Sequence, residues 1–305
     1  MNVLITGSSG FLGKYLVQEL NKSGVVINLV DKNDNPELIS DKFKNINIVE
    51  HGDYSEILAG MNVVVHLANL AHVDSHVDEE IYLSNNCIAT LNFARQAASQ
   101  GVEKFIYIST ANIYRFYNEE YKRINLDLNV DAQTKSKAQA EQELLALAGA
   151  ANMQVIILRP PLIYGNNVKG NLRKLASIVK RRFPLPLKGV KNVRSFVYAG
   201  NVASLIRFLI ESDSSDTGVF TLADCEISTA ELVSNISMSI ESNCFTFFFP
   251  HQLISLVLRC LGKLSLADAL FESFVVPEDI RLKHMGWQAS ITSKEGFENS
   301  FKEFK

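Results

Sequence analysis

MNVLITGSSGFLGKYLVQEL, residues 1–20, has the pattern of a strand, a glycine-rich turn and a helix. The apolar run at 2–6 leads into the turn, and the helical pattern covers 11–23. Gly7 would permit the tight turn, Gly10 would let the backbone approach a pyrophosphate, and Gly13 would let the helix pack closely on the strand. Because strand, glycine spacing and helix coincide, we predict a dinucleotide site rather than an ordinary strand-to-helix turn.

An acidic residue completes this pattern. Asp31 ends the next apolar run, twenty-one residues after Gly10, where a carboxylate can accept hydrogen bonds from ribose hydroxyls. The carboxylate would also repel a 2′-phosphate, while Lys32 beside it adds a cation. We therefore expect NAD(H), rather than its phosphorylated form, as the cofactor.

The order of the apolar runs predicts the fold class. Strand-length runs lie at 2–6, 25–30, 46–49, 62–67, 104–109 and 154–158, and helix-like segments lie at 11–23, 54–59, 79–100 and 134–150. This alternation predicts an α/β fold, a Rossmann-type doubly wound parallel sheet with helices on both faces.

The regular alternation stops after Gly165. Lysines and arginines cluster from 169 to 194, and a strand, a helix at 201–211 and a strand at 218–222 follow. We expect a dinucleotide-binding domain at 1–165, to which 195–224 returns. Residues 166–194 and 225–305 would form a smaller C-terminal substrate-binding lobe.

Composition bears on partners and location. The chain has 305 residues, is 47% hydrophobic and has a net charge of −3, so it offers no basic field for nucleic acid. Its four cysteines are widely spaced and are expected to be reduced core thiols. The first strand begins without room for a signal segment, so we expect a cytoplasmic protein.

The least polar stretch is CFTFFFPHQLISLVLRCL, residues 244–261. Pro250, His251, Gln252 and Arg259 interrupt it, so we do not expect a transmembrane helix. We expect a strand followed by a core-facing helix, with peripheral contact with a membrane as the alternative.

Seven short motifs lie along the chain, each at one position. They are TGSSGFLG at 6–13, GDY at 52–54, HLAN at 66–69, NNCIAT at 85–90, ISTANIY at 108–114, RPPLIYG at 159–165 and HMGW at 284–287. Together they resemble the extended short-chain dehydrogenase/reductase family, specifically its nucleotide-sugar epimerases, dehydratases and 4-ketoreductases. The resemblance runs nearly from end to end of the chain.

The resemblance implies a set of binding residues. The positions that match cofactor contacts are Gly7, Ser9, Gly10, Phe11, Leu12, Gly13, Asp31, Lys32, Asp53, Leu67, Ala68, Asn86, Lys137 and Pro160. The positions that match contacts with a UDP-sugar are His72, Thr110, Asn171 and Arg194, the last as the arginine that holds the pyrophosphate. The run from RPP to RSFVY most resembles the bacterial branch that handles UDP-N-acetylhexosamines or their 4-keto derivatives in surface-polysaccharide synthesis.

One catalytic position departs from the family pattern. The Tyr-x-x-x-Lys motif reads QTKSK at 133–137, so Lys137 matches and Gln133 replaces the tyrosine. In the family the lysine binds the nicotinamide ribose and lowers the tyrosine's pKa, and Thr110 matches a hydroxyl that contacts the reacting sugar oxygen. An amide cannot titrate, and losing one acid/base group typically costs about two to four orders of magnitude in rate.

Other groups could replace the missing phenol. Tyr114, Tyr117 and Tyr121 lie in the loop after Thr110, near the predicted active site, and Lys137 could protonate the reacting sugar oxygen directly. We expect each tyrosine to be a packed or surface aromatic. HVDSHVDEE at 72–80 has metal-type residues, yet the resemblance places it in a cleft loop, and we expect no metal. KRR at 180–182 is expected to be a solvated helix end.

The sequence thus supports two hypotheses. The first is an NAD-dependent nucleotide-sugar 4-epimerase or 4-ketoreductase with Thr110 and Lys137 at the redox centre. The second is a catalytically impaired regulatory or partner protein that binds NAD and a nucleotide sugar, and Gln133 is the feature that supports it. By resemblance, 79–100 and 134–150 would form a homodimer interface.

Overall fold

The computed structural model describes residues 1–33, 42–71, 77–118, 123–124, 130–214 and 216–304. The chain divides into two compact units. The first unit comprises Met1–Pro160, Val202–Leu222 and Asp279–Gln288, and the second comprises Pro161–Asn201, Ala223–Glu278 and Ala289–Lys305.

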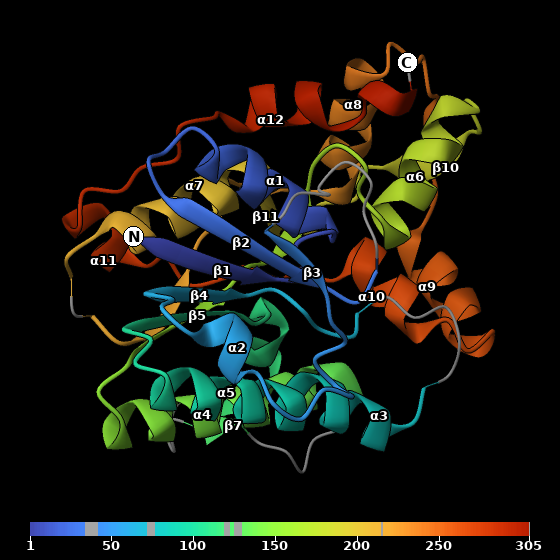
Figure 1. The fold of residues 1–305 in the computed structure, drawn as a ribbon. Helices are drawn as coiled ribbons and strands as arrows, with labels where there is room; N and C mark the ends of the chain where they lie inside the picture. Colours follow the sequence, from blue (N-terminus) through green and yellow to red (C-terminus); the bar gives the residue numbers. More distant parts are fainter. Residues whose placement is uncertain (34–41, 72–76, 119–122, 125–129, 215, 305) are drawn as a thin grey trace. The chain divides into compact units, whose positions relative to one another are not determined.

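The first unit is built on a seven-stranded sheet in which every pairing is parallel (Figure 1). The strand order is β12-β8-β5-β4-β1-β2-β3. The strands are β1 Asn2–Thr6, β2 Val26–Asp31, β3 Phe43–Asn45, β4 Val63–His66, β5 Lys104–Ile108, β8 Gln154–Arg159 and β12 Gly218–Thr221. Central strands β4 and β5 are buried throughout, as expected for a parallel sheet covered on both faces.

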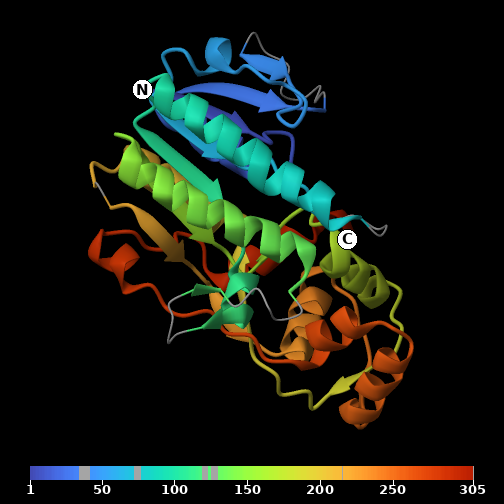
Figure 2. The same cartoon turned by 90° about the horizontal axis from the view of Figure 1, so that it is seen from below.

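Helices cover both faces of this sheet. α1 (Phe11–Leu20), α7 (Ala199–Glu211) and α11 (Ile280–His284) lie on one face, and α4 (Ala89–Ser99) and α5 (Ala132–Ala150) lie side by side on the other (Figures 1 and 2). The remaining elements of this unit are α2 Ser55–Leu58, α3 Glu79–Leu83, η2 Ser84–Ile88, η3 Ala111–Phe116, β6 Tyr117–Asn118 and β7 Arg123–Ile124. The predicted Rossmann-type fold is confirmed.

Two elements differ from the sequence prediction. The strand expected at 46–49 is a turn, in which Asn47 O accepts bonds from the amides of Glu50 and His51. Ile48 is apolar because it packs in the core, not because it belongs to a strand. The helix expected at 79–100 is interrupted by the π-helical turn η2, a feature often found at functional sites.

The second unit contains two small sheets. β13 (Cys225–Ile227), β11 (Arg194–Tyr198) and β9 (Leu162–Tyr164) form one, and β10 (Leu185–Lys188) pairs in parallel with β14 (Thr246–Phe248) in the other. Tyr164 stacks on Phe297 with ring centroids 4.3 Å apart. The helices are α6 Gly170–Lys180, α8 Thr229–Ser239, α9 His251–Cys260, α10 Leu264–Phe271, α12 Ser293–Ser300 and the short η4 Lys302–Phe304.

The observed division differs from the expected domain ranges at three places. The first boundary follows Pro160 rather than Gly165, because β9 pairs with β11 in the second unit. Residues 195–224 were expected to return to the first domain. Because β11 pairs with β9, the chain instead re-enters the first unit at Val202 and leaves it after Leu222. Residues 279–288, expected in the substrate lobe, belong to the first unit.

The apolar stretch 244–261 forms a strand and a helix, β14 and α9, as predicted. The prediction that the helix faces the core is wrong, because none of the α9 side chains is buried. Cys260 on this helix is exposed, so the expectation of core thiols holds for Cys87 but not for Cys260. Across the described residues, every helix is too short or too polar to cross a membrane.

Candidate functional site

The glycine turn after β1 leaves no room for side chains. Gly7 has a φ of +69°, and a Cβ there would lie 2.7 Å from Ala68 N. A Cβ on Gly13 would lie 2.5 Å from the carbonyl oxygens of both Gly7 and Ser8. Gly10 is the N-cap of α1, and its amide donates to Gly7 O at 3.0 Å. The close backbone contacts at Gly7 and Gly13 therefore require glycine at both positions.

The N-terminus of α1 is suited to an anion. Its first amides have no carbonyl one turn earlier to bond, and the first turn contains no acidic side chain. A pyrophosphate there would meet these amides and the positive end of the helix dipole. This fits the predicted role of the turn in holding a dinucleotide.

Asp31 ends β2 beside the turn and is buried. Its Oδ2 accepts the Ser9 amide at 2.9 Å, and its Oδ1 accepts the Asn33 amide at 3.0 Å. A carboxylate has about four acceptor sites, and these two bonds from described residues use two of them. Lys32 next to it is exposed. The role of both residues on the adenosine side of the cofactor stays a prediction.

A polar cluster lies at the carboxyl ends of β1 and β4. Thr6 pairs with His66 in the sheet register, and Thr6 Oγ1 lies 3.0 Å from His66 Nδ1. His66 Nε2 lies 3.1 Å from Thr90 Oγ1 on α4. Burial lowers the pKa of His66 to about 3, so the imidazole is neutral and ties two strands to a helix.

Asn86, predicted as a cofactor contact, is hydrogen-bonded to two other parts of the first unit. Its side chain is fully buried in η2, where Oδ1 accepts the Leu70 amide at 2.7 Å and Nδ2 donates to Leu70 O at 3.1 Å. Nδ2 also donates to Ser136 Oγ on α5 at 3.3 Å. Asn86 therefore fixes the loop after β4 against the catalytic helix, and acts as a positioning residue.

The predicted redox residues lie in the second turn of α5 and just after β5. Lys137 is 3% exposed and its Nζ donates to Ile108 O at 2.9 Å. Burial lowers the pKa of the Lys137 ammonium to about 8. Two residues beyond Ile108, Thr110 is half-buried, and its Oγ1 accepts the Asn112 amide at 3.2 Å. The Thr110 hydroxyl can still donate one hydrogen bond.

Gln133 lies one helical turn before Lys137. The helix starts after Asp131, whose carboxylate accepts the Thr134 amide at 2.9 Å. Gln133 is half-buried, and residues four apart share a helix face. The glutamine therefore shares a face of α5 with the lysine, and its correspondence to the family tyrosine stays a prediction from the sequence.

Tyr114, one of the candidates to replace the phenol, packs against Arg159. The Arg159 guanidinium lies 4.7 Å from the centroid of its ring, and burial raises the pKa of Tyr114. The ring is thus packed in the first unit, as the sequence predicted for a structural aromatic. Of the other candidates, the side chain of Tyr117 and the whole of Tyr121 lie outside the described residues.

The other predicted cofactor residues divide by burial. Leu12, Leu67 and Pro160 are buried, and Pro160 O accepts the Ala111 amide at 2.9 Å. Ser9, Phe11 and Ala68 are half-buried around the glycine turn, and Asp53 is exposed. Asp53 Oδ1 accepts the Ser55 amide at 2.9 Å, and this bond lowers the pKa of Asp53.

The predicted substrate residues fall in different parts of the chain. Arg194 opens β11 in the second unit, and its guanidinium donates to Asp268 O at 3.1 Å. Asn171 is exposed in the first turn of α6. His72 lies outside the described residues, as do Asp74 and His76. Within the described ranges, no group of three or more metal-type side chains comes together.

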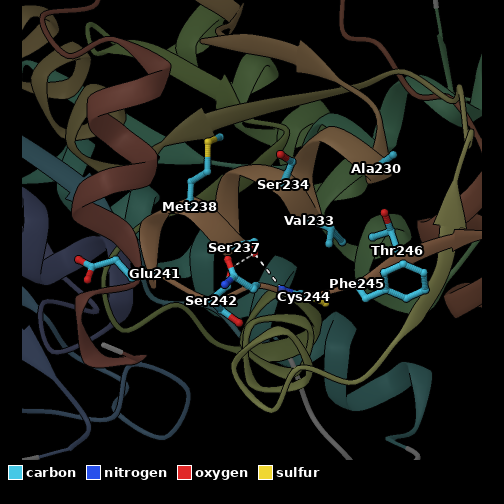
Figure 3. Close-up of a pocket in the computed structure, with 11 residues that line it drawn as sticks. Ala230, Val233, Ser234, Ser237, Met238, Glu241, Ser242, Cys244, Phe245 and Thr246 are labelled. Atoms are coloured by element: carbon cyan, nitrogen blue, oxygen red, sulfur yellow. Dashed lines mark hydrogen bonds between the residues drawn. The ribbon is translucent and has the colours of Figure 1, made fainter.

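A hollow of about 680 Å³ lies in the second unit between α8 and β14 (Figure 3). Ser234, Ser237 and Ser242 contribute to its lining, and Glu241 is the charged residue there. None of the predicted cofactor or substrate residues lines it. The hollow is therefore separate from the predicted site.

Several residues that shape the site were not predicted. Thr6, Thr90 and the ion pair of Glu141 with Arg159 are buried polar groups with specific partners. A polar residue inside or directly after an apolar run of the sequence was the signal that could have identified these buried polar groups. Ser109 is also buried beside Thr110, and its Oγ has no hydrogen-bond partner among the described residues.

Comparison with known proteins assigns the chain to a family. Residues 3–223 match the NAD dependent epimerase/dehydratase family. The chain belongs to this family. Its cofactor is NAD, and the resemblance to nucleotide-sugar epimerases is confirmed. The free amides at the start of α1 and the Asp31 carboxylate have the chemistry that the pyrophosphate and ribose of NAD require.

Individual relatives cover the whole chain. A UDP-glucose 4-epimerase of Vibrio cholerae is 31% identical over 317 residues, which cover 99% of this chain and 95% of the relative. The structure of a Thermus thermophilus UDP-glucose 4-epimerase in complex with NAD has a TM-score of 0.75, at 21% identity and with 100% and 99% of the two chains covered. The structure of a UDP-N-acetylglucosamine 4-epimerase of Methanobrevibacter ruminantium, in complex with UDP-N-acetylmuramic acid, has a TM-score of 0.76 at 19% identity. The match covers 99% of this chain and 97% of that chain. These structures show that the fold is shared.

Substitution of Gly13 tests the close packing of α1 on the turn. Gly13→Ala is expected to destabilise the first unit by about 1–3 kcal/mol, because the new Cβ would overlap backbone oxygens, and to weaken NAD binding. Gly149→Ala is the matched control, since nothing lies within 4 Å of its added Cβ. Denaturant unfolding and NAD titration calorimetry measure both effects. Equal stability of the two variants would contradict the proposed packing role.

Proposed function

We propose that the chain is an NAD-dependent 4-epimerase of UDP-N-acetylhexosamines in surface-polysaccharide synthesis. Reduction of a UDP-4-keto-6-deoxyhexosamine at C4 is the related alternative, because both reactions move hydride between nicotinamide and C4. The observation that carries the proposal is the buried Lys137 ammonium, fixed on Ile108 O at the end of the strand that leads to Thr110. The Vibrio cholerae relative, a UDP-glucose 4-epimerase, supports epimerisation.

Each residue has a separate task in this proposal. Bound NAD supplies the hydride acceptor. The glycine turn and Asp31 hold its pyrophosphate and adenosine ribose, and Lys137 binds the nicotinamide ribose. The Thr110 hydroxyl donates to the C4 oxygen of the sugar, while Gln133 can hydrogen-bond but cannot exchange a proton. The Arg194 guanidinium contacts the substrate pyrophosphate.

The missing phenol leaves Lys137 to transfer the proton. With a pKa of about 8, its ammonium is charged below that pH and can act as an acid. The rate of 4-keto-sugar reduction is then expected to be constant below pH 8 and to fall about tenfold per pH unit above it. The pH dependence is measured from initial rates over about two pH units on either side of that pKa, from about pH 6 to about pH 10. Lys135→Met is the control, and a flat profile would rule out Lys137 as the acid.

A substrate experiment tests the function itself. Purified protein with NAD is incubated with UDP-GlcNAc, and separately with UDP-4-keto-6-deoxy-GlcNAc and NADH. We expect slow formation of the C4 epimer in the first reaction without net change in NADH. Oxidation of NADH in the second reaction would instead support the ketoreductase. Absence of both reactions, with NAD binding intact, would contradict the enzyme proposal.

A second candidate function follows from Gln133 alone. The chain would bind NAD and a nucleotide sugar as a regulatory or partner protein, without efficient catalysis. The intact binding positions around Gln133 support this candidate as much as they support the enzyme. It predicts that UDP-GlcNAc stabilises the NAD-bound protein against thermal unfolding although no product forms.

We also propose a homodimer through helices α3, η2, α4 and α5. Ile81 and Ile88 are 46% and 57% exposed on this helical stretch, and Leu145 on α5 is 36% exposed. Apolar side chains grouped in this way are typical of protein–protein contacts. Sedimentation equilibrium measures the mass in solution, and a monomer at micromolar concentration would contradict the dimer.

A further inference from the structure

The helix α9 exposes an apolar stripe. Leu253, Leu256, Val257 and Leu261 are 51%, 58%, 56% and 64% exposed. Their spacing of three and four residues places them on one face of the helix. Since α9 buries none of its side chains, this face is available for contact.

Strand β14 and its neighbours extend the stripe with aromatic rings. Phe245, Phe248 and Phe249 are 65%, 72% and 42% exposed, and they directly precede α9. Phe183 is 57% exposed, and its carbonyl accepts a bond from Cys244 Sγ at 3.3 Å. The Leu185 amide donates to Phe245 O at 2.9 Å. The segment after α6 and β10 are therefore bonded to the residues just before β14, and α9 follows β14 along the chain. We call the exposed side chains of these segments the β14–α9 surface.

Cations predominate beside the aromatic rings of this surface. The sequence from 166 to 210 contains no acidic residue, and neither does 242–267. Exposed cations border the aromatic rings: Lys180, Arg181 and Arg182 precede Phe183, and Lys188 pairs with Phe248 in the strand register. Arg259 is paired with Asp268 and Glu272 and adds little to this field.

The hollow beside the surface is lined by both polar and apolar side chains. Figure 3 shows Phe245 and Thr246 at one end of the hollow and Met238 and Glu241 at the other. Of the exposed aromatic rings of the β14–α9 surface, Phe245 contributes to this lining, whereas Phe248, Phe249 and the exposed leucines of α9 are not part of it. These other side chains are thus available to a broad apolar layer.

We propose that the β14–α9 surface docks on an anionic lipid membrane. Leucine and phenylalanine side chains would enter the boundary between headgroups and acyl chains, and the lysines and arginines would contact anionic headgroups. Charge complementarity selects the membrane, because the exposed cations at 180–182 and Lys188 beside the aromatic rings attract anionic headgroups and would repel the same cations on a second copy. Docking is independent of the chemistry at Lys137 and Gln133, and extends the proposed function to the location of the enzyme.

Vesicle binding tests this inference with the full chain. Co-sedimentation is measured with phosphatidylcholine vesicles that contain roughly one quarter phosphatidylglycerol, and with phosphatidylcholine alone. We expect binding to the anionic vesicles that weakens as salt rises. A polarity-sensitive fluorophore on the exposed thiol of Cys260 should shift its emission on binding, since Cys260 lies on α9.

Paired variants separate the two parts of the surface. Leu256→Ser with Val257→Ser is expected to reduce the vesicle partition coefficient by at least about tenfold. Arg181→Glu with Arg182→Glu is expected to reduce it by a similar factor on anionic vesicles only. Ile280→Ser is the control, because Ile280 is 57% exposed in the first unit. NAD binding and thermal unfolding should be unchanged in all three.

Three results would overturn the inference. The first is equal co-sedimentation with both kinds of vesicle, and the second is a loss of vesicle binding in Ile280→Ser as large as in the surface variants. The third is the absence of vesicle binding together with a mass that rises with protein concentration and that only Leu256→Ser with Val257→Ser returns to the monomer value. The last result would assign the surface to a second copy of the chain.

Discussion

Gln133→Tyr is expected to raise turnover by about two to four orders of magnitude, the contribution typical of one positioned acid/base group. The substituted position lies one helical turn before Lys137 and is half-buried. A phenol there would share the face of α5 that holds the lysine. The Lys137 ammonium would favour the phenolate and lower the tyrosine's pKa. The variant thereby regains a group that can exchange a proton with the C4 oxygen.

Two controls separate proton transfer from packing. Gln133→Phe introduces the ring without the hydroxyl, and it is expected to stay at the rate of the natural chain. Gln142→Tyr places a tyrosine on an exposed position of the same helix, and should change nothing. Single-turnover rates and NAD affinity are measured for all variants, because equal NAD affinity confines the effect to the chemical step.

The outcome also decides between the two candidate functions. Measurable turnover in the natural chain with a large gain in Gln133→Tyr supports an enzyme in which another group performs the proton transfer slowly. No turnover in the natural chain, with activity in the variant, would mean that the chain is a binding protein. Comparable rates in both would show that position 133 does not carry the proton, and would exclude the impaired protein as well.

The pH dependence of Gln133→Tyr should differ from that of the natural chain. In the natural chain the acid is expected to be Lys137, with a pKa of about 8. In the variant the phenol becomes the acid and the lysine remains as its cationic neighbour. A change in the position of the pH-dependent step would therefore identify which group transfers the proton.

The sequence predicted the elements that depend on local pattern. The glycine turn and Asp31 were identified because each glycine has a specific steric reason and the acid follows at a fixed distance along the chain. Strands β4 and β5 were identified because burial on both faces gives an unbroken apolar run. Such features can be predicted from the sequence without knowing which residues pack against them.

Features that depend on tertiary partners were missed or misread. Asn86 has the residue type of a ligand, but its amide is used by Leu70 and Ser136, which lie far from it in sequence. The stretch 46–49 alternates like a strand because Ile48 packs in the core. The apolar pattern of α9 resembles that of a core helix, and only burial shows that it faces outward. Periodicity indicates an apolar face without indicating what covers it.

The ion pair of Glu141 and Arg159 joins the catalytic helix to the sheet. Arg159 Nε lies 3.0 Å and 3.1 Å from the two carboxylate oxygens of Glu141, and the side chains are 8% and 3% exposed. Arg159 ends β8 directly before Pro160, and it also contacts the Tyr114 ring. Glu141 lies one turn beyond Lys137 on α5. The pair therefore holds Lys137 and the strand end in fixed positions.

Glu141→Ala is expected to lower the free energy of unfolding by about 3–5 kcal/mol, because it leaves a buried guanidinium without its counter-charge. Glu143→Ala on the same helix is the matched control. Its partner Arg95 lies 3.8 Å away and the two side chains are 62% and 56% exposed, so the loss should be about 0–1 kcal/mol. Urea unfolding followed by circular dichroism measures both values.

A double substitution shows whether the cost comes from the unpaired charge. Glu141→Leu with Arg159→Met replaces the pair by apolar groups of similar volume, and such replacements are often neutral or stabilising. We expect the double variant to be more stable than Glu141→Ala, while NAD binding, which depends on the glycine turn, is retained. If the double variant is as unstable as Glu141→Ala, the packing of the pair and not its charge balance holds α5 on the sheet. If Glu141→Ala loses no more than Glu143→Ala, the pair does not anchor the helix.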